Sequence, residues 1–150
     1  MLQNAVAARW DVDYLVPAQD PEDVRRINVA LTPATSGQTY QLAKGTILGE
    51  ITATPGIYVA YDDDGTDDGR RVARGILENA VVVDDAGNIT FTATAGQKGG
   101  EWGQTQKYAP MIYRGGVWKT AELTGLDANG VADLQACVIQ GDLSSGLLRL

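Results

Sequence analysis

Short apolar stretches separated by glycine-containing turns fill the chain from Tyr40 onward, and this pattern constrains the fold more than any other feature. Ile57–Tyr61, Val72–Leu77 and Ile89–Thr94 are rich in β-branched and aromatic side chains, as strands are. Thr54–Gly56 contains the proline and glycine of a tight turn. Many short strands with little helix predict a compact, mainly β domain of barrel or sandwich type, with one or two short helices.

Weaker signals complete the expected order of elements. Asp84–Asn88 is predicted as a hairpin loop, and Ala95–Gln106 as a mobile, glycine-rich surface loop. Asp127 is a candidate N-cap for a short helix over Val131–Ile139. Pro110 lies inside a predicted strand and therefore indicates a sheet edge or a bulge. The other predicted strands are Ile47–Ile51, Ala80–Val83, Tyr108–Arg114, Val117–Lys119 and Leu147–Leu150.

Residues 1–39 differ from the rest of the chain. Asp20 and Pro21 are suited to the N-cap and first position of a short helix, which Thr32–Gly37 would end. The segment has apolar side chains without a clear helical period at Trp10, Tyr14, Leu15 and Val16. Two interpretations stay open: a strap packed across its own domain, or an arm that becomes ordered on a partner. We predict an arm over residues 1–39 and one β domain over residues 40–150.

The composition excludes several classes of function. The chain of 150 residues has no histidine, so Ser-His-Asp and Cys-His catalysis and imidazole zinc sites are excluded. Its net charge is −7 and no stretch concentrates Lys and Arg, so we expect no nucleic-acid partner. The apolar runs are too short to cross a membrane, and no membrane partner is expected. We predict no cofactor, no metal and no enzymatic activity.

The densest group of charges is the acidic loop, Asp62–Gly69. Calcium favours several oxygen ligands from a flexible loop, which makes this segment a candidate. The spacing fails, because Asp67 occupies the position of the sharp-turn glycine and Ala73 that of the closing glutamate. A solvated connector between two strands is the first interpretation, and a loop that holds a cation is the second.

Several further side chains are candidates for a site. Arg70, Arg71 and Arg74 follow the acidic loop and either balance its charge or form salt bridges between subunits. Trp118 lies in a predicted strand and is expected in the core or at a subunit interface, although with Trp102 it would also suit carbohydrate stacking.

We expect no catalytic role for the only cysteine or for the glutamates. Cys137, the only cysteine, lies in an apolar run and is expected to be buried. A carboxylate mechanism needs a pair of acidic side chains. The spacing of the glutamates selects no such pair among Glu50, Glu78, Glu101 and Glu122.

Three phrases, read in order, carry a resemblance to a known family. They are Leu42–Thr52; then Tyr58–Asp62 with Asp67–Gly69 and Ala73–Leu77; then Met111–Trp118 followed by Leu123. In this order they resemble the bacteriophage lambda head decoration protein family over residues 40–150. The connection at 84–107 and the segment before residue 40 are both longer than that family's pattern.

The resemblance implies a small β-tulip-like barrel that forms homotrimers on the outer surface of the virion, after synthesis in the bacterial cytoplasm. Such proteins bind the major capsid protein of the expanded shell at local three-fold sites and stabilise it against internal DNA pressure. Their N-terminal arm adds backbone to a sheet of the capsid protein, a mode that pairs free strand edges. On this basis we expect Trp10, Tyr14, Leu15 and Val16 to contact the capsid and Arg70, Arg71, Arg74 and Trp118 to lie at the trimer interface.

Two other functions remain as alternatives. A carbohydrate-binding or tail-associated β binding module is suggested by Trp102 and Trp118. A carboxylate-dependent hydrolase is disfavoured because no acid pair is defined.

Overall fold

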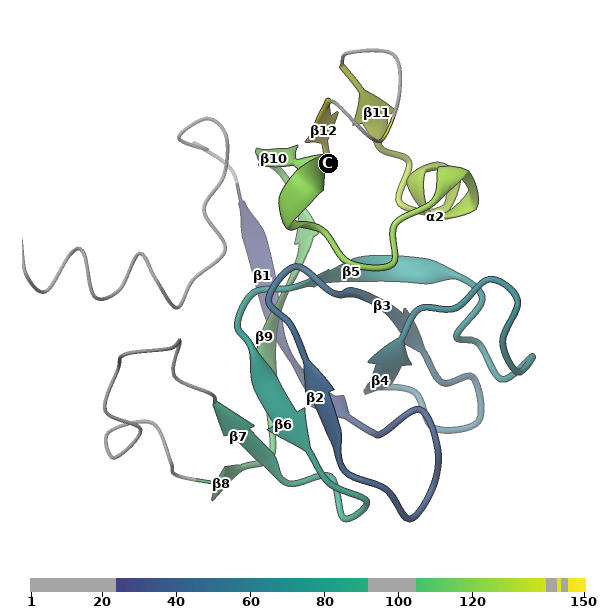
Figure 1. Cartoon of the computed structure of the whole chain (residues 1–150), viewed down its shortest axis with the longest axis vertical. Helices are drawn as coiled ribbons and strands as arrows, with labels where there is room; N and C mark the ends of the chain where they lie inside the picture. Colours follow the sequence, from purple (N-terminus) through teal and green to yellow (C-terminus); the bar gives the residue numbers. More distant parts are fainter. Residues whose placement is uncertain (1–23, 92–104, 140–142, 144–145) are drawn as a thin grey trace, which may run out of the picture.

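The computed structural model describes residues 24–91, 105–139, 143 and 146–150. Figure 1 shows a central barrel with a small sheet above it and another below it. The only helical elements in these ranges are the 3-10 helix η2 (Thr120–Glu122) and the α-helix α2 (Ala128–Asp133). The predicted mainly β fold with one or two short helices is therefore confirmed.

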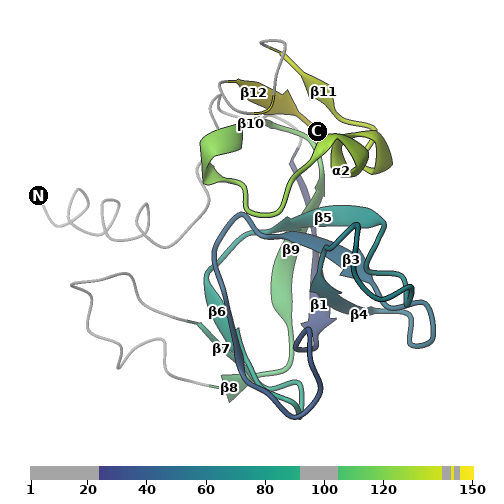
Figure 2. The ribbon, with the colours of Figure 1, turned by 45° about the vertical axis from the view of Figure 1, so that its right-hand side comes forward.

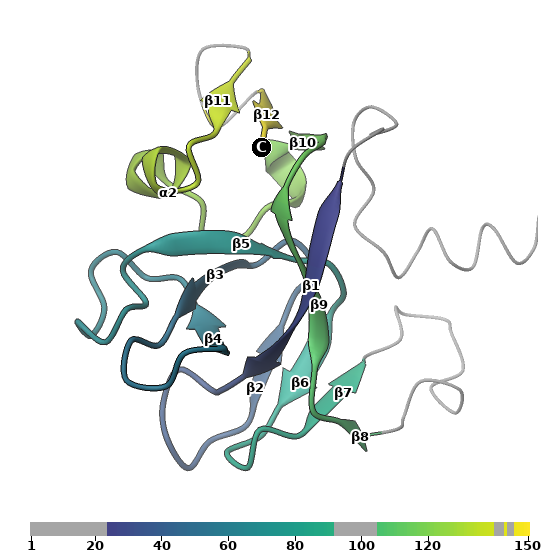
Figure 3. The same cartoon turned by 180° about the vertical axis from the view of Figure 1, so that it is seen from behind.

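The centre of the molecule is a closed barrel. Its strands follow the order β1 (Arg25–Leu31), β4 (Ile57–Ala60), β3 (Ile47–Glu50), β5 (Ala73–Leu77) and β9 (Ala109–Arg114). β1 pairs in parallel with β4, and the other neighbours are antiparallel. β1 and β9 lie side by side along the barrel in the view from behind (Figure 3). Closure leaves none of these strands with a free edge.

Two smaller sheets extend the barrel. One contains β2 (Tyr40–Leu42), β6 (Val81–Val83), β7 (Ile89–Phe91) and β8 (Thr105–Gln106), and the other contains β10 (Val117–Lys119), β12 (Leu147–Arg149) and β11 (Cys137–Val138). Figure 2 shows the second of these sheets, the C-terminal sheet, beside α2 at one end of the barrel. The predicted hairpin joins β6 to β7, and the Asp84 carboxylate stabilises it by accepting hydrogen bonds from the N–H groups of Ala86 and Asn88 at 3.0 and 2.9 Å.

The buried side chains form two clusters. The larger one fills the space between the barrel and the β2–β6–β7–β8 sheet, and includes Val29, Leu31, Leu77, Val81 and Ile89. The second lies toward the C-terminal sheet and is formed by Ile47, Tyr61, Ala73, Ile76, Ile112 and Trp118, with partly buried Val24, Leu123, Leu126, Leu134 and Leu150. Full burial of one such side chain contributes about 1.5–3 kcal/mol, so both clusters hold the small sheets to the barrel.

The structure moves the predicted boundary of the domain. Residues 25–31, which we assigned to the arm, form barrel strand β1. Val29 and Leu31 of this strand are each only 2% exposed. The sequence hid the strand because its first four residues are exposed, which leaves too short an alternation of buried and exposed positions to recognise.

Other predictions require smaller corrections. Asp127 caps α2 as expected, accepting from the Gly130 N–H at 2.7 Å, but the helix ends at Asp133 and Cys137 begins a strand. The side chain of Cys137 is exposed rather than buried. Pro110 is not on an edge strand, because β9 lies between β5 and β1 in the barrel. It pairs with Asn28 of β1, and the paired residues of β9 and β5 begin one position later, at Met111. The end of the predicted loop at Ala95–Gln106 forms β8, which pairs with β7.

Candidate functional site

The acidic loop joins β4 to β5 and is anchored by its own charges. Arg70 Nε donates to Asp68 Oδ1 at 2.9 Å and Arg70 Nη2 donates to Asp68 Oδ2 at 2.7 Å, which makes a bidentate pair. Arg70 Nη1 also donates to the carbonyl oxygen of Ala34 at 3.1 Å, in the segment after β1. The hydrogen bonds from Arg70 hold the pKa of Asp68 below its usual value, because they favour the ionised carboxylate.

Two more contacts tie the acidic loop to its surroundings. Arg71 Nε donates to the carbonyl oxygen of Gly65 at 2.8 Å, and Asn129 Nδ2 donates to Asp63 Oδ2 at 2.7 Å, which links the loop to α2. Across the described residues, no group of three or more His, Cys, Asp or Glu side chains could hold a metal ion. Among the described residues, the contacts of the loop engage Asp63 and Asp68, while the side chains of Asp62, Asp64 and Asp67 have no partner.

The four residues predicted at the trimer interface lie in different environments. The side chain of Arg70 is only 14% exposed and is engaged by Asp68. Arg71 and Arg74 are exposed, and Arg74 lines a pocket of about 240 Å³ beside Glu50. Of the three arginines in this set, Arg71 and Arg74 are therefore the ones with exposed side chains.

Trp118 is enclosed by its own chain. It is 1% exposed, packs in the second core cluster and donates from Nε1 to the carbonyl oxygen of Gly115 at 2.9 Å. The prediction of a core position is confirmed, and the side chain offers no surface to a neighbouring subunit. Stacking of a carbohydrate on this ring is excluded by the same burial, while Trp102 lies outside the described residues.

Two of the four candidate glutamates, Glu50 and Glu78, have separate structural contacts. Arg26 Nε donates to both carboxylate oxygens of Glu78 at 2.8 and 2.9 Å, a pair that sequence reasoning missed, and Glu78 is 5% exposed. Glu50 accepts a backbone N–H of the turn before β4 at 2.8 Å. Glu122 Oε2 is buried and has no hydrogen-bond partner in the described part of the chain, and Glu101 lies outside it. No catalytic pair emerges from these contacts.

Helix α2 is fixed to the barrel by two carboxylates. The Tyr61 hydroxyl donates to Asp127 Oδ1 at 2.8 Å, the oxygen that also caps the helix. Burial and this donated hydrogen bond raise the pKa of Tyr61 far above its ordinary value. Asp133 Oδ2 accepts the Ala73 N–H at 2.9 Å. These contacts fix the end of α2, which forms one wall of the pocket described next.

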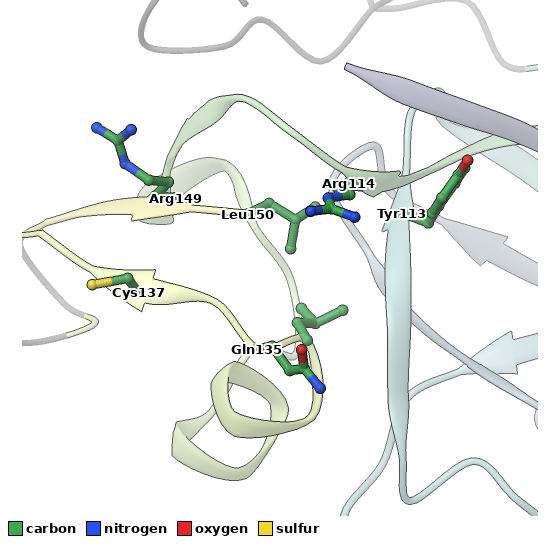
Figure 4. A pocket seen from close by; sticks show the side chains of 7 residues that line it. Tyr113, Arg114, Gln135, Cys137, Arg149 and Leu150 are labelled. Atoms are coloured by element: carbon green, nitrogen blue, oxygen red, sulfur yellow. The ribbon is translucent and has the colours of Figure 1, made fainter. Parts of the chain in front are cut away.

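A pocket of about 400 Å³, here called the arginine pocket, lies between β9, the end of α2 and the C-terminal sheet. It is lined by Tyr113, Arg114, Leu134, Gln135, Cys137, Arg149 and Leu150. Figure 4 shows Tyr113 and Arg114 on β9, Gln135 after α2, and Cys137 and Arg149 on neighbouring strands. Within the described residues, neither arginine has an ion pair or a side-chain hydrogen bond. The sequence did not indicate this site, since its residues come from distant segments.

Gln135 in this pocket has an unusual backbone. Its φ is +51°, and it is the only described residue other than glycine with a positive φ. It follows the helix end, where Gln135 N–H donates to Ala132 O at 3.1 Å and Ala136 N–H donates to Val131 O at 3.0 Å. This is a Schellman motif, in which glycine normally occupies the position of Gln135. A side chain is therefore held here against the local conformational preference.

No helix in the described ranges is long and apolar enough to cross a membrane. The predicted capsid-contacting residues Trp10, Tyr14, Leu15 and Val16 lie outside the described residues. Comparison of the chain with family models, with curated proteins and with solved structures found no match.

Proposed function

We propose that this chain is a structural virion protein that decorates the outer surface of an expanded bacteriophage capsid as a homotrimer and stabilises it against internal DNA pressure. The observation that carries the proposal is where the three resembling phrases lie. The first includes β3, the second β4 and β5, and the third β9 and β10. In the barrel, β4, β3, β5 and β9 are consecutive neighbours, so the phrases form one continuous piece of structure.

Glycines within these phrases meet specific steric demands. Gly45 has a φ of +82°, and a Cβ there would collide with the carbonyl oxygen of Glu122. A Cβ on Gly75 would lie 2.7 Å from both the side chain of Met111 and the carbonyl oxygen of Ile112. Close approach of backbone is what these glycines permit. The phrases are thus coupled through packing, which supports treating them as one family pattern rather than as separate coincidences.

The proposed capsid-binding arm is the segment before β1. Its anchors would be Trp10, Tyr14, Leu15 and Val16, since aromatic and branched side chains dominate the energetics of interfaces. An arm that pairs its backbone with an open strand edge of the major capsid protein becomes ordered when it binds. Three arms in each trimer would add avidity without new contacts.

The proposal assigns no catalytic reaction, cofactor, nucleic-acid partner or membrane partner to the chain. It is supported by the lack of histidine and by the separate structural contacts of Glu50 and Glu78. Arg71 and Arg74 are the arginines that would face a neighbouring subunit, because Arg70 is engaged by Asp68.

Co-sedimentation of the purified chain with capsid shells tests this function. We expect saturable binding to expanded shells and none to unexpanded shells, because the sites form during expansion. A chain lacking residues 1–20 keeps β1 and should fold, yet should lose binding. Matched controls are Ile139→Ala and Tyr108→Ala, which remove exposed apolar groups elsewhere on the domain. Absence of binding to both kinds of shell would refute decoration, and unchanged binding by the shortened chain would refute the arm.

A further inference from the structure

The C-terminal sheet has one face that is buried and one that is open. Trp118 and Leu148, which are opposite each other in the β10–β12 ladder, are only 1% and 0% exposed, and Trp118 packs with barrel residues. Successive side chains of a strand point to opposite faces, so the residues on either side of these two lie on the outer face. Val117 on that face is buried. The rest of the outer face consists of Lys119, Cys137, Leu147 and Arg149.

This outer face is exposed and positively charged. Lys119, Cys137 and Arg149 are exposed, and Leu147 is partly buried. Figure 4 shows the side chains of Cys137 and Arg149 directed away from Gln135 and the end of α2. The three strands of the sheet contain two cations and no acidic residue. Neither cation has a hydrogen bond or an ion pair in the part of the chain that the structure describes. On a chain with a net charge of −7, such a face attracts an acidic surface.

The acidic loop carries the complementary charge. Asp62, Asp64 and Asp67 are exposed, and their side chains have no partner among the described residues. The hydrogen bonds that Asp63 and Asp68 accept fix the loop to α2 and to Arg70. The three exposed carboxylates are therefore held on an anchored loop, which loses little conformational freedom when it binds.

The two surfaces do not meet within one copy of the chain. The acidic loop joins β4 to β5 at the side of the barrel, whereas the C-terminal sheet lies at its end (Figure 1). The outer face of that sheet points away from the barrel, because the opposite face packs on it. The two surfaces can therefore meet only between copies. Contact between two different patches is heterologous, and heterologous contacts close into a ring when the rotation between copies allows it.

We propose that the acidic loop of one copy binds the outer face of the C-terminal sheet of the next copy, and that three such contacts close the free protein into a ring. The number of copies rests on the proposed function, since complementary charge alone does not set the size of a ring. Every copy contributes both surfaces, so none is left without a partner. Arg71, which is bonded to Gly65 of the loop, lies at the edge of this contact.

Cross-linking of thiols in the full-length chain tests which surfaces meet. Cys137, the only cysteine, lies on the outer face, and Asp64→Cys adds a second thiol in the acidic loop. A bis-maleimide should join the two thiols of neighbouring copies and give a covalent trimer on a denaturing gel. The control Ala86→Cys adds its thiol to the exposed hairpin loop between β6 and β7 and should give no trimer. Dimers linked through Cys137 alone in the unchanged chain would indicate a two-fold contact and would overturn the ring.

Exchange of charge tests whether the contact is electrostatic. Lys119→Glu with Arg149→Glu, or replacement of the three exposed aspartates of the acidic loop by lysine, should raise the dissociation constant of the trimer about tenfold or more. A variant with both sets of substitutions again has opposite charges on the two surfaces and should regain association. Lys107→Glu reverses one exposed charge directly after β8 and should leave association unchanged. Sedimentation velocity measures all four, and added salt should weaken the unchanged trimer.

Three results would overturn the contact: a chain that stays monomeric at every concentration, trimers that survive either charge reversal, and a combined variant that fails to regain association. None of these measurements uses capsid shells, so they are independent of the co-sedimentation experiment. A chain that decorates shells but gives no covalent trimer would contradict this contact alone. Covalent trimers that leave expanded shells bare would contradict capsid decoration alone.

Discussion

The acidic loop and the arginine pocket carry opposite charges, and the fold uses their charged side chains to different extents. In the acidic loop, Asp68 is bound by Arg70, and Asp63 is bound by Asn129. In the arginine pocket, neither Arg114 nor Arg149 has a partner within the described part of the chain. The fold engages the two carboxylates that tie the acidic loop to Arg70 and to α2, whereas Asp62, Asp64 and Asp67 have no side-chain partner among the described residues. Charge that is dense in the sequence is therefore used in part to anchor a loop, while the pocket arginines anchor nothing that is described.

The largest effect on the free energy of unfolding is expected at Arg70, whose guanidinium group is held by Asp68 and by the Ala34 carbonyl oxygen. Arg70→Gln removes a bidentate pair to Asp68 and the bond to the Ala34 carbonyl oxygen. Hydrogen bonds to charged groups contribute about 1.5–3 kcal/mol, so the free energy of unfolding should fall by about 2 kcal/mol. Urea denaturation of both proteins measures it.

Arg71→Gln is the matched control for that substitution. Arg71 is exposed and makes one bond, to the Gly65 carbonyl oxygen. Its loss should cost less than about 0.5 kcal/mol. Equal effects at the two arginines would mean that the acidic loop is not anchored as described.

A smaller effect, with a defined pH dependence, is expected at Asp68. Its pKa is lowered from the ordinary 3.8 by hydrogen bonds from Arg70, so the folded state binds the proton more weakly than the unfolded state. The resulting stabilisation is complete above the unfolded value and is lost as the pH falls toward the folded value. Asp68→Asn should therefore cost about 1 kcal/mol at neutral pH, a difference that shrinks below about pH 4.

Denaturation with urea across this pH range measures the difference. Asp67→Asn, at an exposed position of the same loop, supplies the control for general loss of charge. A difference between the unchanged chain and Asp68→Asn that stays constant with pH would show that the Arg70–Asp68 pair is not its source.

The strands could be predicted where each carries its own local signal. β4, β5, β6 and β9 were found because their runs of β-branched or aromatic residues are bounded by glycine, proline or aspartate. β1 was missed because only Val29 and Leu31 among its residues are buried, and its partners lie far away in the sequence. Cys137 was placed in the core because its neighbours are apolar, yet α2 ends early and turns this residue outward.

The arginine pocket could not be predicted, for a related reason. Arg114, Gln135 and Arg149 line one pocket only because barrel strand β9, the paired strands β11 and β12 and the end of α2 come together in the tertiary structure. The acidic loop was visible because its charges are adjacent in the sequence. Local patterns thus reveal clusters of residues that are close in sequence, whereas a site assembled from separate strands requires the tertiary structure.

Gln135→Gly tests whether the left-handed backbone of Gln135 lowers the stability of the folded chain. Glycine relieves the strain of a φ of +51° but loses more freedom on folding, so we expect a net gain of about 0.5–1 kcal/mol in the free energy of unfolding. Thermal and urea unfolding measure it. The control Gln135→Ala keeps the strain, removes the amide and should show no gain. Loss of stability in the glycine variant would show that the amide of Gln135 has a structural role that exceeds the strain.

The smallest change in stability is expected where the charges are unpartnered. The double variant Arg114→Gln, Arg149→Gln removes two guanidinium groups that bind no described residue, so its direct effect on unfolding should stay within about 0.5 kcal/mol. The same two-charge change at Arg70 and Arg71 should cost several times more, because Arg70 is bonded to Asp68 and to Ala34. Urea denaturation of the two double variants makes the comparison directly. A large loss in the pocket variant would mean that its arginines hold the fold together, and the contrast between satisfied and unsatisfied charge would fail. A small loss would show that the stability of the barrel does not depend on these two arginines.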